Sequence, residues 1–157
     1  RLLPFVELTL SVFPISWAFG RAGCTLAHDH PGVRTSASNP LAFAFPDGPR
    51  WDLGFLELLF ALVLSIVVVR MWQKEQSPGT YVAVTCLSYA PVRFLLDFLR
   101  ASDAEGGDAR YASLTPGQWA AVGLACIGVV AAREVREAHA RAHRDVSPLR
   151  SAPAPLP

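Results

Sequence analysis

The sequence predicts an all-α polytopic membrane protein with about four transmembrane helices and an outer loop after the first of them. Hydrophobic residues make up 52% of the 157 residues and charged residues only 17%, whereas charged residues are roughly a quarter of a soluble domain. The mean hydropathy is +0.31. The alternative is a soluble helical bundle, whose helices need a polar face, and the apolar runs of this chain show almost none.

Four apolar runs carry this prediction. Each covers about 17–20 residues, which at 1.5 Å per residue spans roughly 25–30 Å, enough for the hydrocarbon core of a bilayer. They occupy residues 2–19, 53–69, 81–99 and 114–132. We expect residues 1–132 to form a single transmembrane domain. Residues 133–157 are basic and rich in Pro and Ala, and we expect them to form a disordered tail.

The basic residues predict the orientation of these helices. Arg70 and Lys74 follow the second run, and the tail carries five arginines, Arg133, Arg136, Arg141, Arg144 and Arg150. Basic residues concentrate on the cytoplasmic side of membrane proteins. The sequence therefore predicts a cytoplasmic C-terminus and places residues 20–52 and 101–113 outside.

Charge and cysteine content argue against several other classes. A net charge of +1 does not suit a nucleic-acid-binding protein. The three cysteines have no CxxC spacing, which argues against a disulfide framework or a zinc cluster. His28 and His30 form an H-x-H pair, but no third ligand is evident. We therefore predict no metal and no cofactor.

Charged side chains lie inside the third run, which reads 89-YAPVRFLLDFLR-100. Tyr89, Arg93, Asp97 and Arg100 are spaced at i, i+4, i+8 and i+11, on one helical face. Charges in the hydrocarbon are costly and usually face a partner or a cavity. The pair of Arg93 and Asp97 either only orients helices or forms a cationic site for an anion such as phosphate, which the planar guanidinium binds well. Glu57, a second acid in the membrane, is either protonated or paired with an arginine.

The stretch 19-FGRAGCTLAHDHPG-32 places polar chemistry at the end of the first run. We expect Arg21 to emerge from the membrane on the same side as Arg93, so that both arginines converge on one phosphate. Glycine lets backbone approach backbone or ligand closely, and we expect this role for Gly20, Gly23 and Gly32. His28, Asp29 and His30 are expected at the membrane–water boundary.

Three stretches in this order, 20-GRAGCTLAHDHPG-32, 89-YAPVRFLLDFLR-100 and 114-LTPGQW-119, together resemble the prolipoprotein diacylglyceryl transferase family. These bacterial inner-membrane enzymes move a diacylglyceryl group from phosphatidylglycerol to the cysteine thiol of a lipoprotein precursor, and glycerol phosphate leaves. The resemblance covers roughly residues 19–132. It implies a multi-pass protein of the bacterial inner membrane whose partners are phosphatidylglycerol, the lipobox of a prolipoprotein signal peptide and the lipid bilayer.

The resemblance also implies roles for single residues. Arg21 matches the signature arginine of the family, and Tyr89 and Arg93 match a tyrosine and an essential arginine of a later helix. The usual histidine of the family is not in this chain. Either His28 or His30 stands in as the general base, or the base belongs to the half of the family that has no counterpart here, or the reaction dispenses with a base. The expected substrate-binding residues are those at the remaining motif positions, Cys24, Asp29, Gly32, Glu57, Asp97 and Arg100. Among these, Asp97 replaces a usual glutamate and Glu57 matches the end of the HPxQxYE motif.

The chain departs from the family in two respects. The HPxQxYE motif reads 51-WDLGFLE-57, without its His, Pro, Gln and Tyr. The N-terminal half of the family members, which contains a histidine in an HGG stretch, has no counterpart in this sequence. Family members have about seven membrane spans, and the four apolar runs match the last four of them. The sequence thus predicts a C-terminal part of such an enzyme or a reduced relative. The alternatives are a non-catalytic family member that binds phospholipid or lipoprotein, and an unrelated four-span transporter or assembly subunit.

Overall fold

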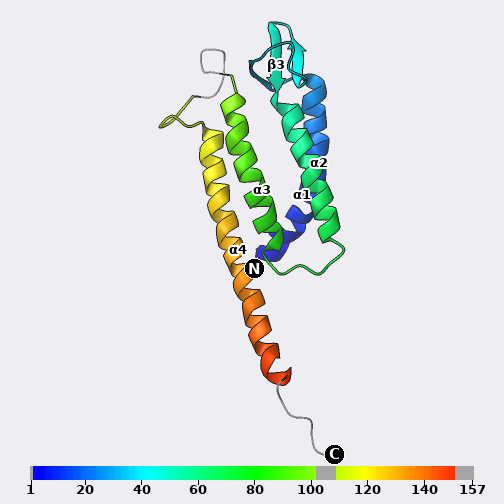
Figure 1. Ribbon diagram of the computed structural model, residues 1–157, viewed down its shortest axis with the longest axis vertical. Coiled ribbons are helices and arrows are strands. Elements are labelled where there is room, and N and C mark those ends of the chain that lie inside the picture. Colours follow the sequence, from blue (N-terminus) through cyan, green and yellow to red (C-terminus); the bar gives the residue numbers. More distant parts are fainter. Residues whose placement is uncertain (1, 102–108, 151–157) are drawn as a thin grey trace, which may run out of the picture.

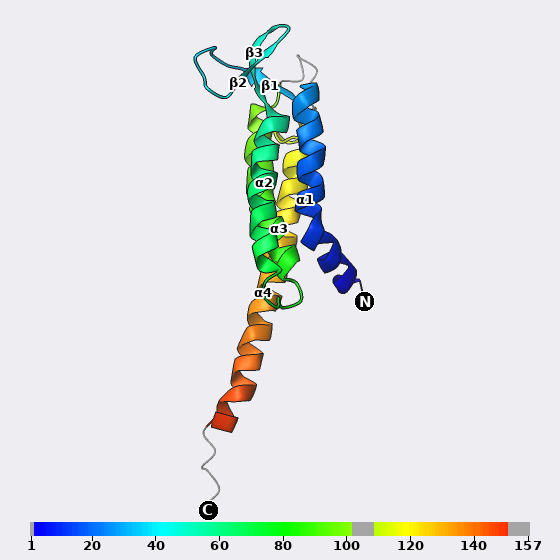
Figure 2. The ribbon, with the colours of Figure 1, turned by 90° about the vertical axis from the view of Figure 1, so that its right-hand side faces the viewer.

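Four helices run alternately up and down in a bundle that carries a small sheet at one end (Figure 1). The computed structural model describes residues 2–101 and 109–150. The helices are α1 (Leu3–Ala27), α2 (Leu53–Met71), α3 (Thr80–Leu96) and α4 (Pro116–Arg150), and a 3₁₀ turn, η1 (Asp97–Leu99), continues α3. Helix α1 begins at the end of the bundle opposite the sheet (Figure 2).

The predicted fold class is confirmed, because all four helices are long and apolar enough to cross a membrane. Large apolar side chains point outward from every helix, among them Phe5, Leu8, Val63, Leu95 and Ile127. The buried positions between helices are mostly small, as at Ala18, Ala61, Ala83, Ala90 and Ala121. Small residues let membrane helices pack closely while large ones face lipid.

Polar side chains mark where three of the helices begin. Asp52 precedes α2 and accepts a hydrogen bond from the Phe55 amide at 3.0 Å. Glu7 of α1 reaches across to the start of α3, where its carboxylate accepts from the amide of Val82 at 3.0 Å. Thr115 precedes α4 and accepts from the amide of Gln118 at 3.1 Å. Each satisfies a backbone N–H that a helix leaves without an internal partner.

Helix α1 is longer than the sequence analysis expects, because it continues through Arg21 and Cys24 to Ala27 and ends at His28, whose φ is 50°. Thr25 supports this last stretch by donating to the Arg21 carbonyl at 2.8 Å. A Cβ at Gly20 or Gly23 would meet nothing within 4 Å. Within the described residues, no other backbone segment therefore approaches these two glycines closely, contrary to that part of the prediction.

The loop between α1 and α2 folds into a three-stranded antiparallel sheet that the sequence analysis does not predict. The strands β1 (Pro31–Arg34), β2 (Ala42–Phe45) and β3 (Gly48–Asp52) lie in the order β1-β3-β2. Arg50 of β3 is buried and donates to the Gly32 carbonyl at 2.9 Å, which ties β3 to β1. At the end of β3, Asp52 pairs with His28 at 2.8 Å. The sheet therefore forms a tight link between α1 and α2.

The structure also differs from the expected tail. Helix α4 continues to Arg150, whereas the sequence analysis expects disorder from residue 133. The reason is composition: residues 133–144 are mainly Ala, Glu and Arg, which are good helix formers. Glu137 precedes Arg141 by four residues, an arrangement that favours helix. Residues 151–157 lie outside the described part of the chain.

Candidate functional site

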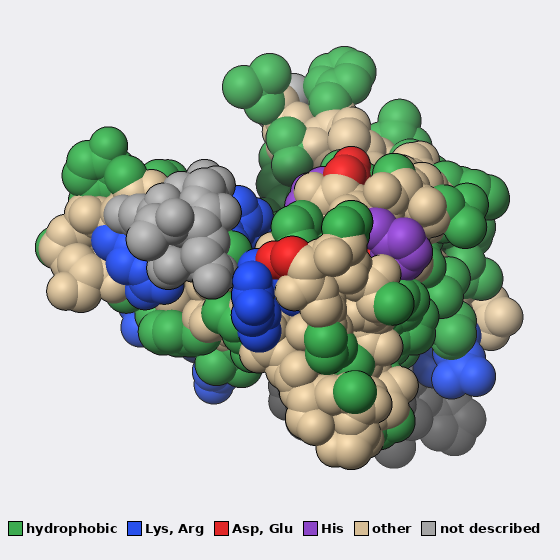
Figure 3. All heavy atoms as spheres, turned by 90° about the horizontal axis from the view of Figure 1, so that it is seen from above, with side chains coloured by type: hydrophobic (Ala, Val, Ile, Leu, Met, Phe, Trp, Pro, Cys, Tyr) green, Lys and Arg blue, Asp and Glu red, His purple; other side chains and the backbone are tan. Residues whose placement is uncertain are grey.

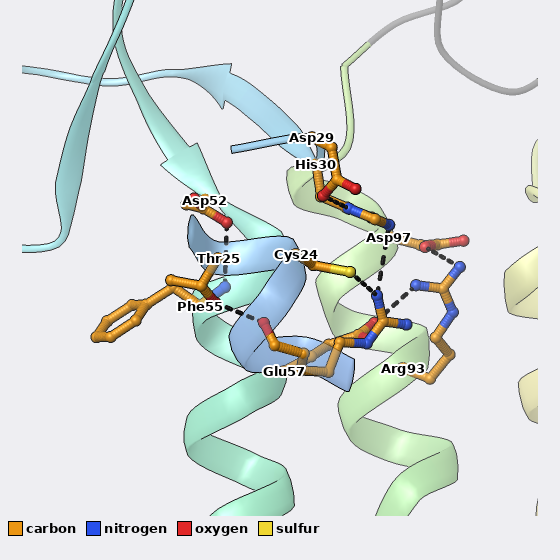
Figure 4. Close-up of polar contacts among 10 residues, drawn as sticks. Cys24, Thr25, Asp29, His30, Asp52, Phe55, Glu57, Arg93 and Asp97 are labelled. Atoms are coloured by element: carbon orange, nitrogen blue, oxygen red, sulfur yellow. Dashed lines mark hydrogen bonds and ion pairs between the residues drawn. The ribbon is translucent and has the colours of Figure 1, made fainter. Parts of the chain in front are cut away.

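A single carboxylate joins the arginines of two helices near the sheet end of the bundle. Glu57 of α2 is 2% exposed. One of its oxygens lies 2.6 Å from Arg21 Nε of α1. The other lies 3.0 Å from Nη1 of Arg93 on α3, which is labelled with Glu57 in Figure 4. Glu57 is thus paired with two arginines, and three helices contribute one charged side chain each to the same place.

Asp97 supplies a second buried carboxylate beside the first. Its Oδ1 lies 3.1 Å from Arg93 Nη2 and 3.5 Å from Arg100 Nε, and its other oxygen accepts a hydrogen bond from the Thr115 hydroxyl. The expected ion pair between Arg93 and Asp97 is present. Because Arg93 gives one terminal nitrogen to Glu57 and the other to Asp97, its guanidinium is held by two carboxylates in a fixed plane.

We call the five side chains Arg21, Glu57, Arg93, Asp97 and Arg100 the arginine cluster. With all five ionised, three arginines and two carboxylates leave one net positive charge. The carboxylates are buried, whereas the side chains of Arg21 and Arg93 keep 20% and 17% exposure. The surface of the sheet end, seen from above, shows acidic, basic and histidine side chains (Figure 3), whereas Glu57 and Asp97 of the cluster lie buried below it. Such a cluster suits one singly charged anion with oxygens that accept from guanidinium.

A histidine and a thiol border the arginine cluster. His30 Nε2 lies 3.4 Å from Arg21 Nη1, and Cys24 Sγ lies 4.0 Å from the same nitrogen. Since a guanidinium has only donors, this contact makes Nε2 the acceptor and leaves the ring proton on Nδ1, which donates to Asp29. The hydrogen bond from His30 lowers the pKa of Asp29 below its usual value. Asp29 therefore stays ionised at neutral pH.

The structure does not bring His28 to the arginine cluster. Its Nδ1 lies 2.8 Å from Asp52, and its ring packs against the rings of Phe43 and Phe45 at 5.4 and 5.6 Å between centroids. His28 ends α1 in a left-handed conformation, which turns the chain so that only His30 reaches Arg21. Of the two histidines that the sequence analysis considers, His30 is the one at the site.

Comparisons with known proteins show the family of this chain. The family model of prolipoprotein diacylglyceryl transferase matches residues 1–133. The chain belongs to the prolipoprotein diacylglyceryl transferase family. It is 30% identical over 111 residues to the phosphatidylglycerol–prolipoprotein diacylglyceryl transferase of Chlorobaculum tepidum. The aligned region covers 67% of this chain and 37% of that protein. It is 28% identical over 136 residues to the one of a Janthinobacterium species, which covers 83% of this chain and 50% of that protein.

A third relative, the enzyme of the same name from Chromohalobacter salexigens, is 30% identical over 134 residues, covering 81% of this chain and 49% of that protein. The chain thus spans half or less of the length of these curated relatives. No solved structure matches.

Two of the transferase-family positions predicted from sequence have a packing role here. Tyr89 lies edge-on to Trp17, with ring centroids 4.7 Å apart, one helical turn before Arg93. Gly32 faces Arg100 in an isolated β-bridge, and a Cβ on it would lie 2.6 Å from the Leu99 carbonyl oxygen. Gly32 therefore lets the sheet cross the end of α3 at close range, as the sequence analysis expects for this glycine.

Sequence reasoning missed the structural roles of three residues beside the arginine cluster. The guanidinium carbon of Arg21 lies over the Trp17 ring, 5.8 Å from the ring centroid, which suits a cation–π contact. Thr115 and Gln118 are buried beside Asp97. Their signal was present in 114-LTPGQW-119, because Thr followed three residues later by Gln marks a capping box at a helix start.

The sequence analysis considers His28 and His30 as a pair of metal ligands. In the structure, the side-chain atoms of Cys24, Asp29 and His30 that could bind a metal lie within 4.8 Å of one another instead. The Arg21 guanidinium already contacts both Cys24 Sγ and His30 Nε2. A metal ion would meet this positive charge at close range. The three residues are therefore poorly suited to bind a cation.

Proposed function

We propose that this chain carries the phospholipid-binding part of a transferase that moves a diacylglyceryl group from phosphatidylglycerol to the lipobox cysteine of prolipoproteins, the activity for which its relatives are named. The arginine cluster carries the proposal, because its one net positive charge and partly exposed guanidiniums complement the single negative charge of a phosphodiester. The test is transfer of labelled diacylglyceryl from phosphatidylglycerol to a lipobox peptide by the protein in membranes.

In this reaction the thiolate of the lipoprotein cysteine attacks the glyceryl carbon of the lipid. A C–S bond forms, the C–O bond to phosphate breaks, and glycerol phosphate leaves with the electron pair. Arg21 and Arg93 would bind the phosphate and stabilise the charge that builds on it. Cys24 is not the nucleophile, since the attacking thiol belongs to the prolipoprotein.

We assign the general base to His30. A free thiol has a pKa near 8.5, so its deprotonation at neutral pH benefits from a base. The ionised Asp29 holds the proton of His30 on Nδ1, which leaves Nε2 as the basic nitrogen. Nε2 contacts Arg21, and a phosphate that engages Arg21 would release this nitrogen to accept the thiol proton.

His30→Gln should therefore lower transfer at pH 7 by roughly 100-fold, since a positioned base typically contributes at least this much. The loss should shrink as the pH rises toward 9, because the thiol then ionises without help. His28→Gln, two residues away and outside the cluster, is the matched control and should keep most of the activity. A pH–rate profile of both variants decides, and a larger loss for His28→Gln would contradict the assignment.

We also infer that the protein is a multi-pass protein of the bacterial inner membrane, with the sheet outside and the end of α4 in the cytoplasm. The basic residues of the tail support this orientation. Ser38 in the sheet region and Ala142 on α4 are both exposed. In intact spheroplasts, an impermeant thiol reagent should label Ser38→Cys and spare Ala142→Cys. Labelling of Ala142→Cys above the level of the parent protein would reverse the orientation.

A second candidate is a family member that binds phospholipid or lipoprotein without catalysis. The altered stretch 51-WDLGFLE-57 favours it, because it lacks four residues of the family motif. Binding of labelled phosphatidylglycerol without transfer to the peptide would support this reading.

A further inference from the structure

The start of α4 is built from two reciprocal hydrogen bonds beside the arginine cluster. Thr115 Oγ1 accepts from the Gln118 amide at 3.1 Å, and Gln118 Oε1 accepts from the Thr115 amide at 3.0 Å. This is a capping box, and Pro116 occupies the first helical position, where its missing N–H costs nothing. Thr115 and Gln118 are 1% and 0% exposed, so the cap is buried among protein atoms rather than solvated.

The same two side chains also hold α3. The Thr115 hydroxyl donates its proton to Asp97 while it accepts from the Gln118 amide, so both of its hydrogen-bonding functions are used. Gln118 Nε2 donates to the Phe94 carbonyl at 3.3 Å. Phe94 and Asp97 flank the last turn of α3, just after Arg93. The residues that cap α4 are thereby hydrogen-bonded to the last turn of α3, beside Arg93 and Asp97.

Between these two residues, Gly117 brings the backbone of α4 against the ion pair itself. A Cβ at this position would lie 2.5 Å from Asp97 Oδ2 and 2.7 Å from Arg93 Nη2. Asp97 is 0% exposed and is held by Arg93, Arg100 and Thr115, so its carboxylate cannot move aside without losing partners. The absence of a side chain at Gly117 is what leaves room for the pair.

We propose that Thr115 and Gly117 are positioning residues for phospholipid binding: they hold Asp97 in place and so fix the plane in which Arg93 presents its guanidinium to the lipid phosphate. The inference rests on the proposed function. Arg93 uses one terminal nitrogen on Glu57 and the other on Asp97, so a displaced Asp97 would rotate the guanidinium about its contact with Glu57. Misplacement of a binding group by about 1 Å is enough to lower rates by roughly 100-fold.

The test compares Gly117→Ala with Gly123→Ala. Both glycines lie in α4, but a Cβ at Gly123 would meet nothing within 4 Å, so this control introduces the same methyl group without the clash. The Michaelis constant for phosphatidylglycerol should rise about 10-fold or more in Gly117→Ala and stay unchanged in Gly123→Ala. A purely structural defect would instead reduce the amount of active protein, lowering kcat and leaving KM as it is.

A second pair of variants covers the case in which Gly117→Ala fails to fold. Thr115→Ser keeps both hydrogen bonds and should keep the KM, whereas Thr115→Val has nearly the same shape without them and should raise it. An unchanged KM in both Gly117→Ala and Thr115→Val, with a parent protein that transfers normally, overturns the positioning role alone. A parent protein that neither binds nor transfers phosphatidylglycerol overturns the proposed function and this inference with it.

Discussion

Arg93→Lys is expected to lose most of the transferase activity while the protein stays folded. The guanidinium of Arg93 reaches Glu57 with Nη1 at 3.0 Å and Asp97 with Nη2 at 3.1 Å. A lysine has one nitrogen in place of this planar fork, so it can pair with one carboxylate and no longer spans both. Since the positive charge is kept, neither buried carboxylate is left without a nearby cation, and the temperature of unfolding should fall by only a few degrees.

We expect transfer to fall on the order of 100-fold, the usual effect of removing one oriented donor from a site that stabilises developing charge. Arg141→Lys on the exposed end of α4 is the matched control and should behave like the parent protein. The measurement is transfer of labelled diacylglyceryl to a lipobox peptide. Near-normal transfer by Arg93→Lys would mean that Arg93 serves only the ion pairs that orient the helices.

Arg21→Lys extends this result, because Arg21 shares Glu57 with Arg93. If both arginines bind one phosphate, the two single changes should have similar effects. The double change should then be much less than additive, since groups that act as a unit fail together. Independent sites would give multiplied losses instead.

The four helices and part of the site could be predicted from sequence because both depend on local patterns. Hydropathy over about 20 residues reveals a membrane span, and helical spacing places Arg93 and Asp97 on one face. The end of α1 was harder to predict, because the two glycines and the polar residues in 20-GRAGC-24 are typical of a loop. Tertiary contacts, including the Arg21–Glu57 ion pair, override that local preference.

Other features depend on contacts between distant segments. The strands have four or five residues each, too few to show a clear alternation of polar and apolar positions. The position of Glu57 between two arginines requires the packing of three helices, which no spacing along the chain reveals. The choice between His28 and His30 depends on the residue at which α1 ends, and helix ends are predicted least reliably.

Glu57→Gln should reduce stability and transfer more than any other single change. Among the described residues, Glu57 is the only acid that pairs with both Arg21 and Arg93, and the change removes its charge. Glutamine has the same shape, so packing is kept, but its amide carries no charge and presents N–H donors to two guanidiniums that can only donate. Removing one partner of a buried ion pair costs about 3–5 kcal/mol. We expect a smaller cost, about 2–3 kcal/mol, because both arginines are partly exposed and water can screen them.

Glu57→Gln should accordingly lower the temperature of unfolding by several degrees and abolish transfer, whereas Arg93→Lys should mainly affect transfer. Glu57→Asp separates charge from reach: it keeps the carboxylate but is shorter by one methylene, so it should retain stability better than Glu57→Gln while still losing transfer. Glu137→Gln, an exposed acid on α4, is the control for loss of a negative charge alone. Thermal unfolding in detergent and the transfer assay on the same samples decide. If Glu57→Gln melts and transfers like the parent protein, then the bridge between α1 and α3 does not hold the arginines together, and the phosphate site built on it must be rejected.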